Sequence, residues 1–211
     1  MATPRVEISL LKAEDADAAF DVATQVFVEG STLHQALGIS LDDYRKYLKD
    51  PFSSMIAEGL SVVANDSSTG EVLGCMIVTD FRNQFEAGAT QNEKFLPLSS
   101  LTLDLCQQYF KGHPPSVGDA ILVDMGAVSP AARGLGLYKQ MRNKVHAHAR
   151  QLGFKRVVGE LSSAATQHHV LHQLHHKPIA EVKFADFEFN GTYPFRSITE
   201  PESIVLSLGD L

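Results

Sequence analysis

The residues best suited to chemistry lie in one strand, loop and helix between Ala120 and Leu152. The strand is the apolar run 121–128, and the loop after it contains the sequence R-G-L-G at 133–136. Apolar residues then recur on one helix face, at Leu137, Met141, Val145 and Ala149. The first turn of a helix has N–H groups without internal partners, and glycine lets a bulky anion come close. Because Arg133 adds positive charge, this unit predicts a site for a phosphate or pyrophosphate.

The spacing of the glycines and their neighbours in the loop indicates which phosphate-containing ligand the unit would bind. A Walker A loop needs Gly-Lys-Ser/Thr, which is lacking, and a dinucleotide fingerprint needs a glycine where Lys139 stands. An ordinary strand–helix unit with a glycine-rich turn is the remaining plain alternative. The stretch resembles the acyl-CoA site of the GCN5-related N-acetyltransferases, Arg/Gln-x-x-Gly-x-Gly/Ala after a strand ending Val-x-Pro. Arg133 and Gly136 match, Tyr138 replaces the small last residue, and a register from Ala131 keeps both glycines but loses the arginine.

This resemblance implies that the loop and the strand before it bind acetyl-CoA as cosubstrate. It also implies that the thioester lies in a gap between the fourth and fifth strands, with its carbonyl polarised by a backbone N–H around 126–128. The cofactor-binding residues that it implies are Met125, Gly126, Ala127, Val128, Arg133, Gly134, Leu135, Gly136, Leu137 and Tyr138.

Length and composition set the protein class. A chain of 211 residues suits one domain, here 1–211. A net charge of −7 argues against a nucleic-acid partner. The chain lacks an apolar run of about 18 residues that could span a membrane, and its first twenty residues lack the apolar core of a signal peptide. With two cysteines, Cys75 and Cys106, the cytoplasm is the expected location.

The order of predicted elements gives an α/β fold. We expect a central mixed, mostly antiparallel sheet flanked by helices, and the resemblance implies that it is splayed between the fourth and fifth strands. Predicted strands are Val6–Leu10, Leu60–Ala64, Glu71–Thr79, Ile121–Val128, Arg156–Leu161, Ile179–Phe189 and Ser203–Leu208. Further predictions are a helix that begins at Ser40 and ends at Pro51, a loop over 82–93, helices Leu96–Phe110 and Ala164–Leu174, and a hairpin turn at Asn190-Gly191.

A narrower resemblance, to the insect-type arylalkylamine N-acetyltransferases, rests on Gly59–Gly74 and Glu181–Ile198. Those enzymes have a Glu-Pro-Leu motif whose glutamate is the proposed general base. The nearest acid here is Glu29, although counting back from Leu37 would put Ser31-Thr32-Leu33 on the motif, without a carboxylate.

Two more catalytic candidates follow from the same resemblance. Ser163 falls near a serine of the family. His172 falls near the place where many acetyltransferases have a general-acid tyrosine, so a proton relay is one reading of it.

A histidine cluster accompanies His172, with His168, His169, His175 and His176 nearby. Spacings of four place pairs on one helix face, as in a two-histidine metal site. Such a site normally needs a third ligand, and the sequence identifies none. We therefore expect a polar helix face and no metal.

The sequence as a whole predicts an acetyl-CoA-dependent N-acetyltransferase that acts on a small primary amine. Three alternatives stay open: a peptide or protein N-acetyltransferase, a nonenzymatic acyl-CoA-binding regulator, and a nucleotide-binding module. The protein is expected to be a monomer or a homodimer.

Overall fold

The computed structural model describes residues 4–86, 90, 92–110 and 115–211. Within them, seven strands form one sheet in the order β1-β2-β3-β4-β5-β7-β6. The strands are β1 Val6–Leu10, β2 Val62–Asp66, β3 Val72–Asp80, β4 Ala120–Val128, β5 Arg156–Leu161, β6 Lys177–Lys183 and β7 Ser203–Asp210. Neighbouring strands are antiparallel except β4 and β5, which are parallel. The predicted mixed, mostly antiparallel sheet is therefore confirmed.

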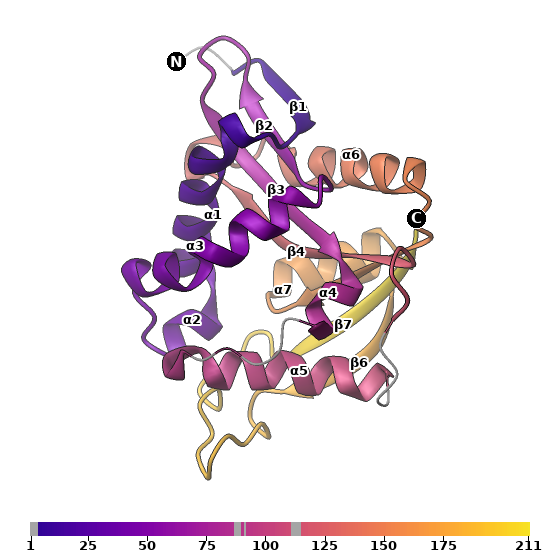
Figure 1. Ribbon diagram of the computed structural model, residues 1–211. Helices are drawn as coiled ribbons and strands as arrows, with labels where there is room; N and C mark the ends of the chain where they lie inside the picture. The colour runs from indigo at the N-terminus through magenta and orange to yellow at the C-terminus, as the bar shows by residue number, and fades with distance from the viewer. Residues whose placement is uncertain (1–3, 87–89, 91, 111–114) are drawn as a thin grey trace.

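Helices cover both faces of the sheet (Figure 1). The α1 face carries α1 Ala16–Gly30, α3 Leu41–Ala57 and α5 Leu96–Phe110. The α6 face carries α6 Leu137–Gln151 and the pair α7 Ala164–Gln167 and η4 His168–Gln173, of which η4 is a π-helix. Shorter helical segments are η1 Ala13–Asp15, α2 Thr32–Ala36, α4 Phe81–Glu86, η2 Glu93–Phe95 and η3 Pro130–Ala132.

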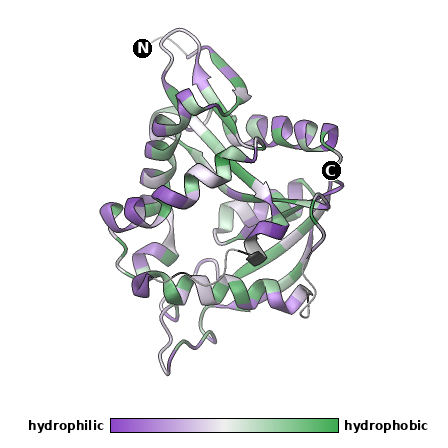
Figure 2. Ribbon diagram, in the orientation of Figure 1, coloured by the Kyte–Doolittle hydropathy of each residue, from purple (hydrophilic) through white to green (hydrophobic). Residues whose placement is uncertain are grey.

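The core is divided between the two faces by strand alternation. Cys75 and Ile77 of β3 pack with α1 and α3, whereas Met76 and Val78 pack with α6. Every residue of β3 is buried, because helices cover it on both sides. The strands at the centre of Figure 2 are accordingly hydrophobic.

The prediction that Pro51 ends its helix is wrong, because Pro51 lies inside α3. Proline removes one backbone hydrogen bond from a helix interior, at a cost of about 3 kcal/mol. Tertiary packing offsets that cost. The next residue, Phe52, is buried with its ring centroid 5.2 Å from that of Phe20.

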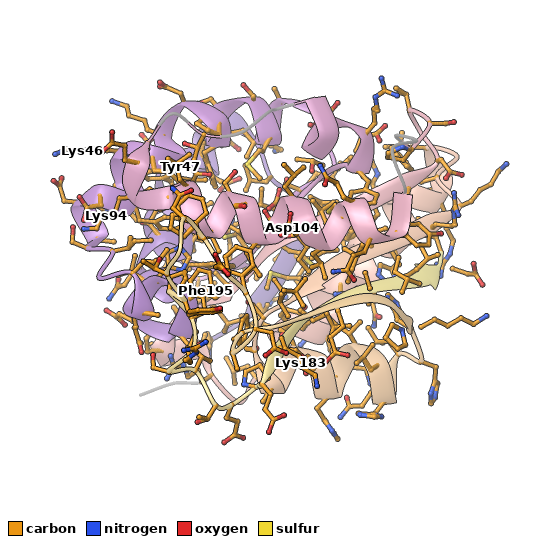
Figure 3. The ribbon with its side chains drawn as sticks, turned by 90° about the horizontal axis from the view of Figure 1, so that it is seen from below. Lys46, Tyr47, Lys94, Asp104, Lys183 and Phe195 are labelled. Carbon is orange, nitrogen blue, oxygen red and sulfur yellow. The ribbon has the colours of Figure 1, made fainter. Side chains whose placement is uncertain are left out.

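The predicted long strand Ile179–Phe189 is confirmed up to Lys183 and wrong beyond it. β6 ends at Lys183, after which Phe184 and Phe187 turn inward to pack on Phe195 beside α5 (Figure 3). The apolar residues after Lys183 belong to a loop whose phenylalanine side chains pack into the core. The turn at Asn190-Gly191 is confirmed, since both residues have positive φ and Phe189 pairs with Thr192.

Two further helical predictions need correction. The helix predicted over 164–174 divides into α7 and the π-helix η4. The loop predicted over 82–93 contains most of α4 and the start of η2, and its residues 87–89 and 91 lie outside the described residues. Helix Leu96–Phe110 is confirmed as α5.

Candidate active site

A β-bulge at Asp124 shapes the centre of the sheet. Val123 pairs with Val78 and Met125 with Ile77, which leaves Asp124 as an extra residue in β4. The side chains change sides there: Val123 packs with α6, whereas Met125 packs with α1 and α3. A bulge bends its strand, increases the local twist and is common beside active sites.

The bulge coincides with the end of the β4–β5 ladder. The parallel pairing runs from Ala120↔Arg156 to Val123↔Gly159 and stops. The next residue on each strand is an acid, Asp124 on β4 and Glu160 on β5. In the described sheet, the edge of β4 beyond Val123 therefore has no paired residue on β5, which is the predicted splay.

A cavity of about 1020 Å³ opens at this gap. Tyr44 and Thr102 line it from the α1 face, and Tyr138 and Arg142 line it from the α6 face. The cavity thus passes through the sheet where β4 and β5 part.

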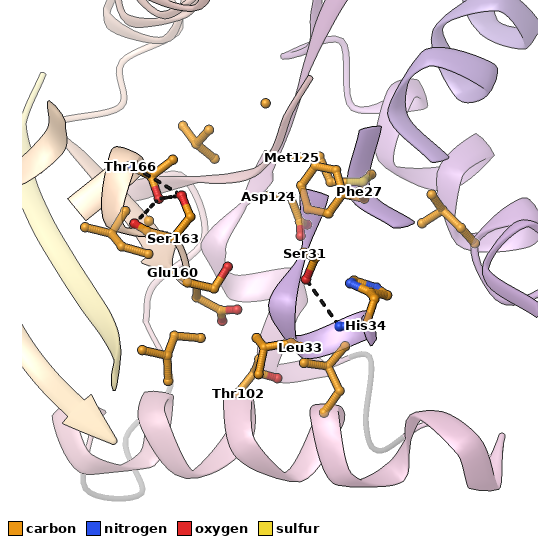
Figure 4. Close-up of a pocket in the computed structure, with 18 of the residues that line it drawn as sticks. Phe27, Ser31, Leu33, His34, Thr102, Asp124, Met125, Glu160, Ser163 and Thr166 are labelled. Atoms are coloured by element: carbon orange, nitrogen blue, oxygen red, sulfur yellow. Dashed lines mark hydrogen bonds between the residues drawn. The ribbon is translucent and has the colours of Figure 1, made fainter. Parts of the chain in front are cut away.

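Two carboxyl groups share the middle of the cavity (Figure 4). Loss of hydration, then the charge of Glu58, raises the pKa of Asp124 to about 7. Loss of hydration, then the charge of Asp124, raises the pKa of Glu160 to about 8, against a weak opposing hydrogen bond from Cys106 Sγ at 3.5 Å. A carboxyl that titrates near neutral pH is suited to general acid–base catalysis.

Cys106 also lines the cavity, but it is a poor nucleophile. Burial, then the charge of Glu160, raises the pKa of its thiol well above the ordinary range. Because the thiolate is the nucleophilic form, this environment does not favour an acyl-cysteine intermediate.

The wall on the α1 face is aromatic. The ring centroids of His34 and Tyr44 are 4.6 Å apart, and Tyr47, which points inward in Figure 3, stacks on Phe95 at 4.0 Å. Burial lowers the pKa of His34 to about 4, so its imidazole is neutral at pH 7. Both ring nitrogens of His34 are buried without a hydrogen-bond partner among the described residues.

The predicted anion-binding loop joins β4 to α6 on the other face. Gly134 and Gly136 have φ of 84° and 68°, left-handed values that favour glycine, and Gly136 directly precedes α6. A Cβ at Gly136 would meet only Gln140 Nε2, at 4.0 Å, so the space before the helix is open. The N–H groups of the first turn of α6 are therefore available to an anion, which fits the diphosphate of a coenzyme A.

The predicted coenzyme residues separate into two groups. Met125, Gly126 and Tyr138 line the cavity. A Cβ at Gly126 would lie 2.5 Å from Tyr138 Cε2, so the tyrosine ring rests against the strand there. The other predicted residues form the rest of β4, the loop to α6 and the first residue of α6, namely Ala127, Val128, Arg133, Gly134, Leu135, Gly136 and Leu137.

The three predicted catalytic side chains lie in different places. Ser163 lines the cavity, caps α7 by accepting from Thr166 N at 3.2 Å, and shares a 2.8 Å hydroxyl contact with Thr166 (Figure 4). His172 is exposed on η4. Glu29 is exposed at the end of α1, where Gln25 Nε2 donates to it at 3.1 Å. Glu29 is not among the described residues that line the cavity.

Sequence reasoning missed Asp124 and Glu160. Each is an acid inside an apolar strand, I-L-V-D-M-G-A-V for β4 and R-V-V-G-E-L for β5. An acid at a position that pattern assigns to the core is a usable signal, because charges are rarely buried without a role.

The raised pKa of Glu160 predicts a change in stability with pH. Between its unfolded value near 4.5 and about 8, the folded state holds the extra proton, so the free energy of unfolding falls as pH rises through this window. Glu160→Gln should reduce that fall and raise Tm at pH 8 by at least about 4 °C. Thermal melts at pH 5 and pH 8 check this, with the exposed Glu71→Gln as matched control. Equal pH dependence in wild type and Glu160→Gln would contradict it.

The histidine cluster does not assemble a metal site within the described part of the chain, where no group of three potential metal ligands is found. His168 and His172 lie 5.5 Å apart by ring centroids. The irrelevance of metal stays a prediction. Among the described helices, none is long and apolar enough to cross a membrane.

No family model matches the chain, and no curated protein matches it. Solved structures match over nearly its whole length. The C-terminal condensation domain of Ebony, in complex with β-alanyl-dopamine, has a TM-score of 0.86 and 19% identity, covering 99% of this chain and 100% of that one.

Two further structures extend the comparison. Arylalkylamine N-acetyltransferase 2 from Aedes aegypti has a TM-score of 0.79 and 19% identity, covering 97% and 98% of the two chains. The protein yncA from Salmonella typhimurium, solved with its cofactor acetyl-CoA, has a TM-score of 0.55 and 14% identity, covering 98% and 94% of the two chains. At these identities the likeness shows a common fold.

Proposed function

We propose that this chain, whose fold is that of the GCN5-related N-acetyltransferases, is an acetyl-CoA-dependent N-acetyltransferase that acts on a small primary amine. The observation that supports this most is the pair of carboxyls, Asp124 and Glu160, where a cavity passes through the sheet. Amide formation needs a group that takes protons from an ammonium, and these acids have pKa values near 7 and 8.

The donor side has the features that an acyl-CoA requires. The unpaired edge of β4 from Met125 to Val128 offers backbone groups along which a pantetheine arm can lie like an added strand. The loop 133–136 and the start of α6 offer N–H groups and Arg133 to the phosphates. The thioester of acetyl-CoA supplies the activated acetyl group. In this arrangement a backbone N–H near Gly126 would polarise its carbonyl.

Asp124 is the proposed base. Its raised pKa of about 7 still leaves part of the carboxyl ionised at neutral pH, and a bound cationic amine favours the ionised form further. The carboxylate takes one proton from the ammonium, passes it to solvent, and takes the second after the amine attacks. Glu160 stays largely protonated at pH 7, which limits charge repulsion between the two acids.

The acceptor side favours an arylalkylamine. Phe27, Tyr44 and Tyr47 provide aromatic surface, and the acid pair attracts the ammonium. The neutral, unpartnered imidazole of His34 can bond a hydroxyl on the substrate ring. The Ebony domain, solved with the amide of an aromatic amine, and the mosquito arylalkylamine enzyme support this choice. An acid-lined cavity with aromatic walls also suits a small amine better than a peptide.

A turnover screen with acetyl-CoA tests the proposal. Thiol release should be fastest with arylalkylamines, slower with polyamines, and slowest with amino acids and peptides. Coenzyme A binding without turnover of any acceptor would favour the nonenzymatic regulator. Thermal stabilisation by ATP or NAD, but not by coenzyme A, would favour a nucleotide-binding module.

A further inference from the structure

A buried arginine lies on the α6 side of the cavity and has no anionic partner among the described residues. Arg142 is 2% exposed and lines the cavity. Its Nη1 donates to Tyr138 Oη at 3.2 Å, whereas Nε and Nη2 find no hydrogen-bond partner among the described residues. A buried guanidinium that lacks an anion costs several kcal/mol of stability. A bound anion would satisfy its free N–H groups.

The groups that face Arg142 do not neutralise it. Tyr138 and His146 come from α6, His169 from η4, and His176 from the residue before β6. Loss of hydration, then the charge of Arg142, lowers the pKa of His146 to about 3 and that of His176 to about 4. Both imidazoles are therefore neutral at pH 7. The further charges that act on them are Arg150 on His146 and Asp210 on His176.

Several buried polar atoms without a hydrogen-bond partner among the described residues gather around Arg142. Besides Arg142, ring nitrogens of His146, His169 and His176 are buried without a partner in the described part of the chain. The ring centroids of Tyr138 and His169 are 5.6 Å apart, and those of His146 and His176 are 6.4 Å apart. Within the described part of the chain, this cluster has hydrogen-bond donors and one full positive charge, and no carboxylate forms an ion pair with that charge.

Tyr138 links this cluster to the gap between β4 and β5. Its ring rests against Gly126 at the unpaired edge of β4, and its hydroxyl accepts from Arg142. The guanidinium is thus about one tyrosine side chain away from the strand edge proposed for the thioester.

We propose that Arg142 is the receptor for the thiolate that leaves when the thioester is broken. The proposal rests on the proposed function. The amine nitrogen forms a bond to the carbonyl carbon, the carbon–sulfur bond breaks, and its electron pair goes to sulfur. Asp124 takes the proton from nitrogen, so one negative charge passes from the carboxylate to sulfur, on the side of the sheet where Arg142 lies.

The physical effect is that of a fixed cation on a thiol. The pKa of a free cysteine thiol is about 8.5, and electropositive surroundings such as an adjacent arginine or lysine lower it to values between about 3.5 and 7.5. In a buried site the same charge stabilises the developing thiolate in the transition state. Tyr138, at the position where the related motif has Gly or Ala, would hold the guanidinium in place.

The test measures coenzyme A bound to the protein, without turnover. The ultraviolet absorbance of the thiolate is followed against pH, with free coenzyme A as reference. At pH 7.5 the ratio of thiolate to thiol in bound coenzyme A should be at least about tenfold that in free coenzyme A, which corresponds to about 1.4 kcal/mol. Arg142→Met should abolish this increase. Arg133→Met is the matched control, because Arg133 is an exposed loop residue: it should weaken binding but leave the thiolate fraction unchanged.

The outcomes separate the two proposals. If wild-type protein does not bind coenzyme A, the proposed function fails. If it binds coenzyme A without any increase in thiolate, or if Arg142→Met keeps the increase, the thiolate receptor is overturned while the acetyltransferase stands. The wild-type measurement decides the first point even if a variant does not fold.

Discussion

Asp124→Asn should lower kcat/KM for an amine acceptor by about 10²- to 10⁴-fold at pH 7, the usual loss on removal of a general base. The wild-type kcat/KM should rise with pH through about 7, as the carboxyl of Asp124 ionises. In the variant this rise of kcat/KM with pH should disappear. Part of the loss should return at high pH, where more of the alkylammonium, with its pKa near ~10, is free amine. Initial rates from pH 5.5 to 9.5 measure both effects.

Two other carboxylates complete this experiment. Asp104 is exposed on α5, and Asp104→Asn should leave the pH profile unchanged. Glu29→Gln tests the base predicted from the sequence. A large loss in Glu29→Gln beside a wild-type profile in Asp124→Asn would return the role to Glu29.

Gly136→Asp should weaken coenzyme A binding by at least about 100-fold and leave the protein folded. Gly136 is in the left-handed region at the start of α6, and aspartate and asparagine tolerate this conformation better than other residues. The new carboxylate would meet the diphosphate at the N–H groups of the helix. Gly136→Asn is the matched control, with the same shape and no charge, and should lose no more than about tenfold. Calorimetry with coenzyme A measures both.

A shorter ligand gives an independent check on the same loop. Pantetheine lacks the phosphates, so its affinity should be similar in wild type and Gly136→Asp. Unchanged coenzyme A affinity in Gly136→Asp would mean that the loop does not bind the phosphates, and it would remove one main support of the acyl-CoA assignment.

The central strand–loop–helix unit was predictable because its signals are local. The glycines at 134 and 136 have positive φ, as a tight loop before a helix requires, and the apolar stripe from Leu137 to Ala149 is buried against the sheet. The strand β5 and the helix α5 have the predicted bounds for the same reason. Predictions from local signals were wrong where tertiary packing determines the backbone conformation, as at Pro51 inside α3 and at Phe184 after β6.

The acid pair could not be predicted as a pair. Asp124 and Glu160 are far apart in the sequence, and two facts bring them together: the parallel register of β4 with β5, and the bulge that ends it. Neither fact has a local sequence signature. The burial of Arg142 could not be predicted either, since an arginine within an amphipathic helix normally belongs to its solvated face.

The passage through the sheet has a consequence for the order of events in turnover. Because the aromatic wall and the anion-binding loop lie on opposite faces, acceptor and donor need not compete for one entrance. Both can be bound at once, with the acids between them, and the buried thiol of Cys106 is not set up to store an acetyl group in the meantime. Under the proposed function turnover would pass through a ternary complex, so the steady-state kinetics should be sequential rather than ping-pong.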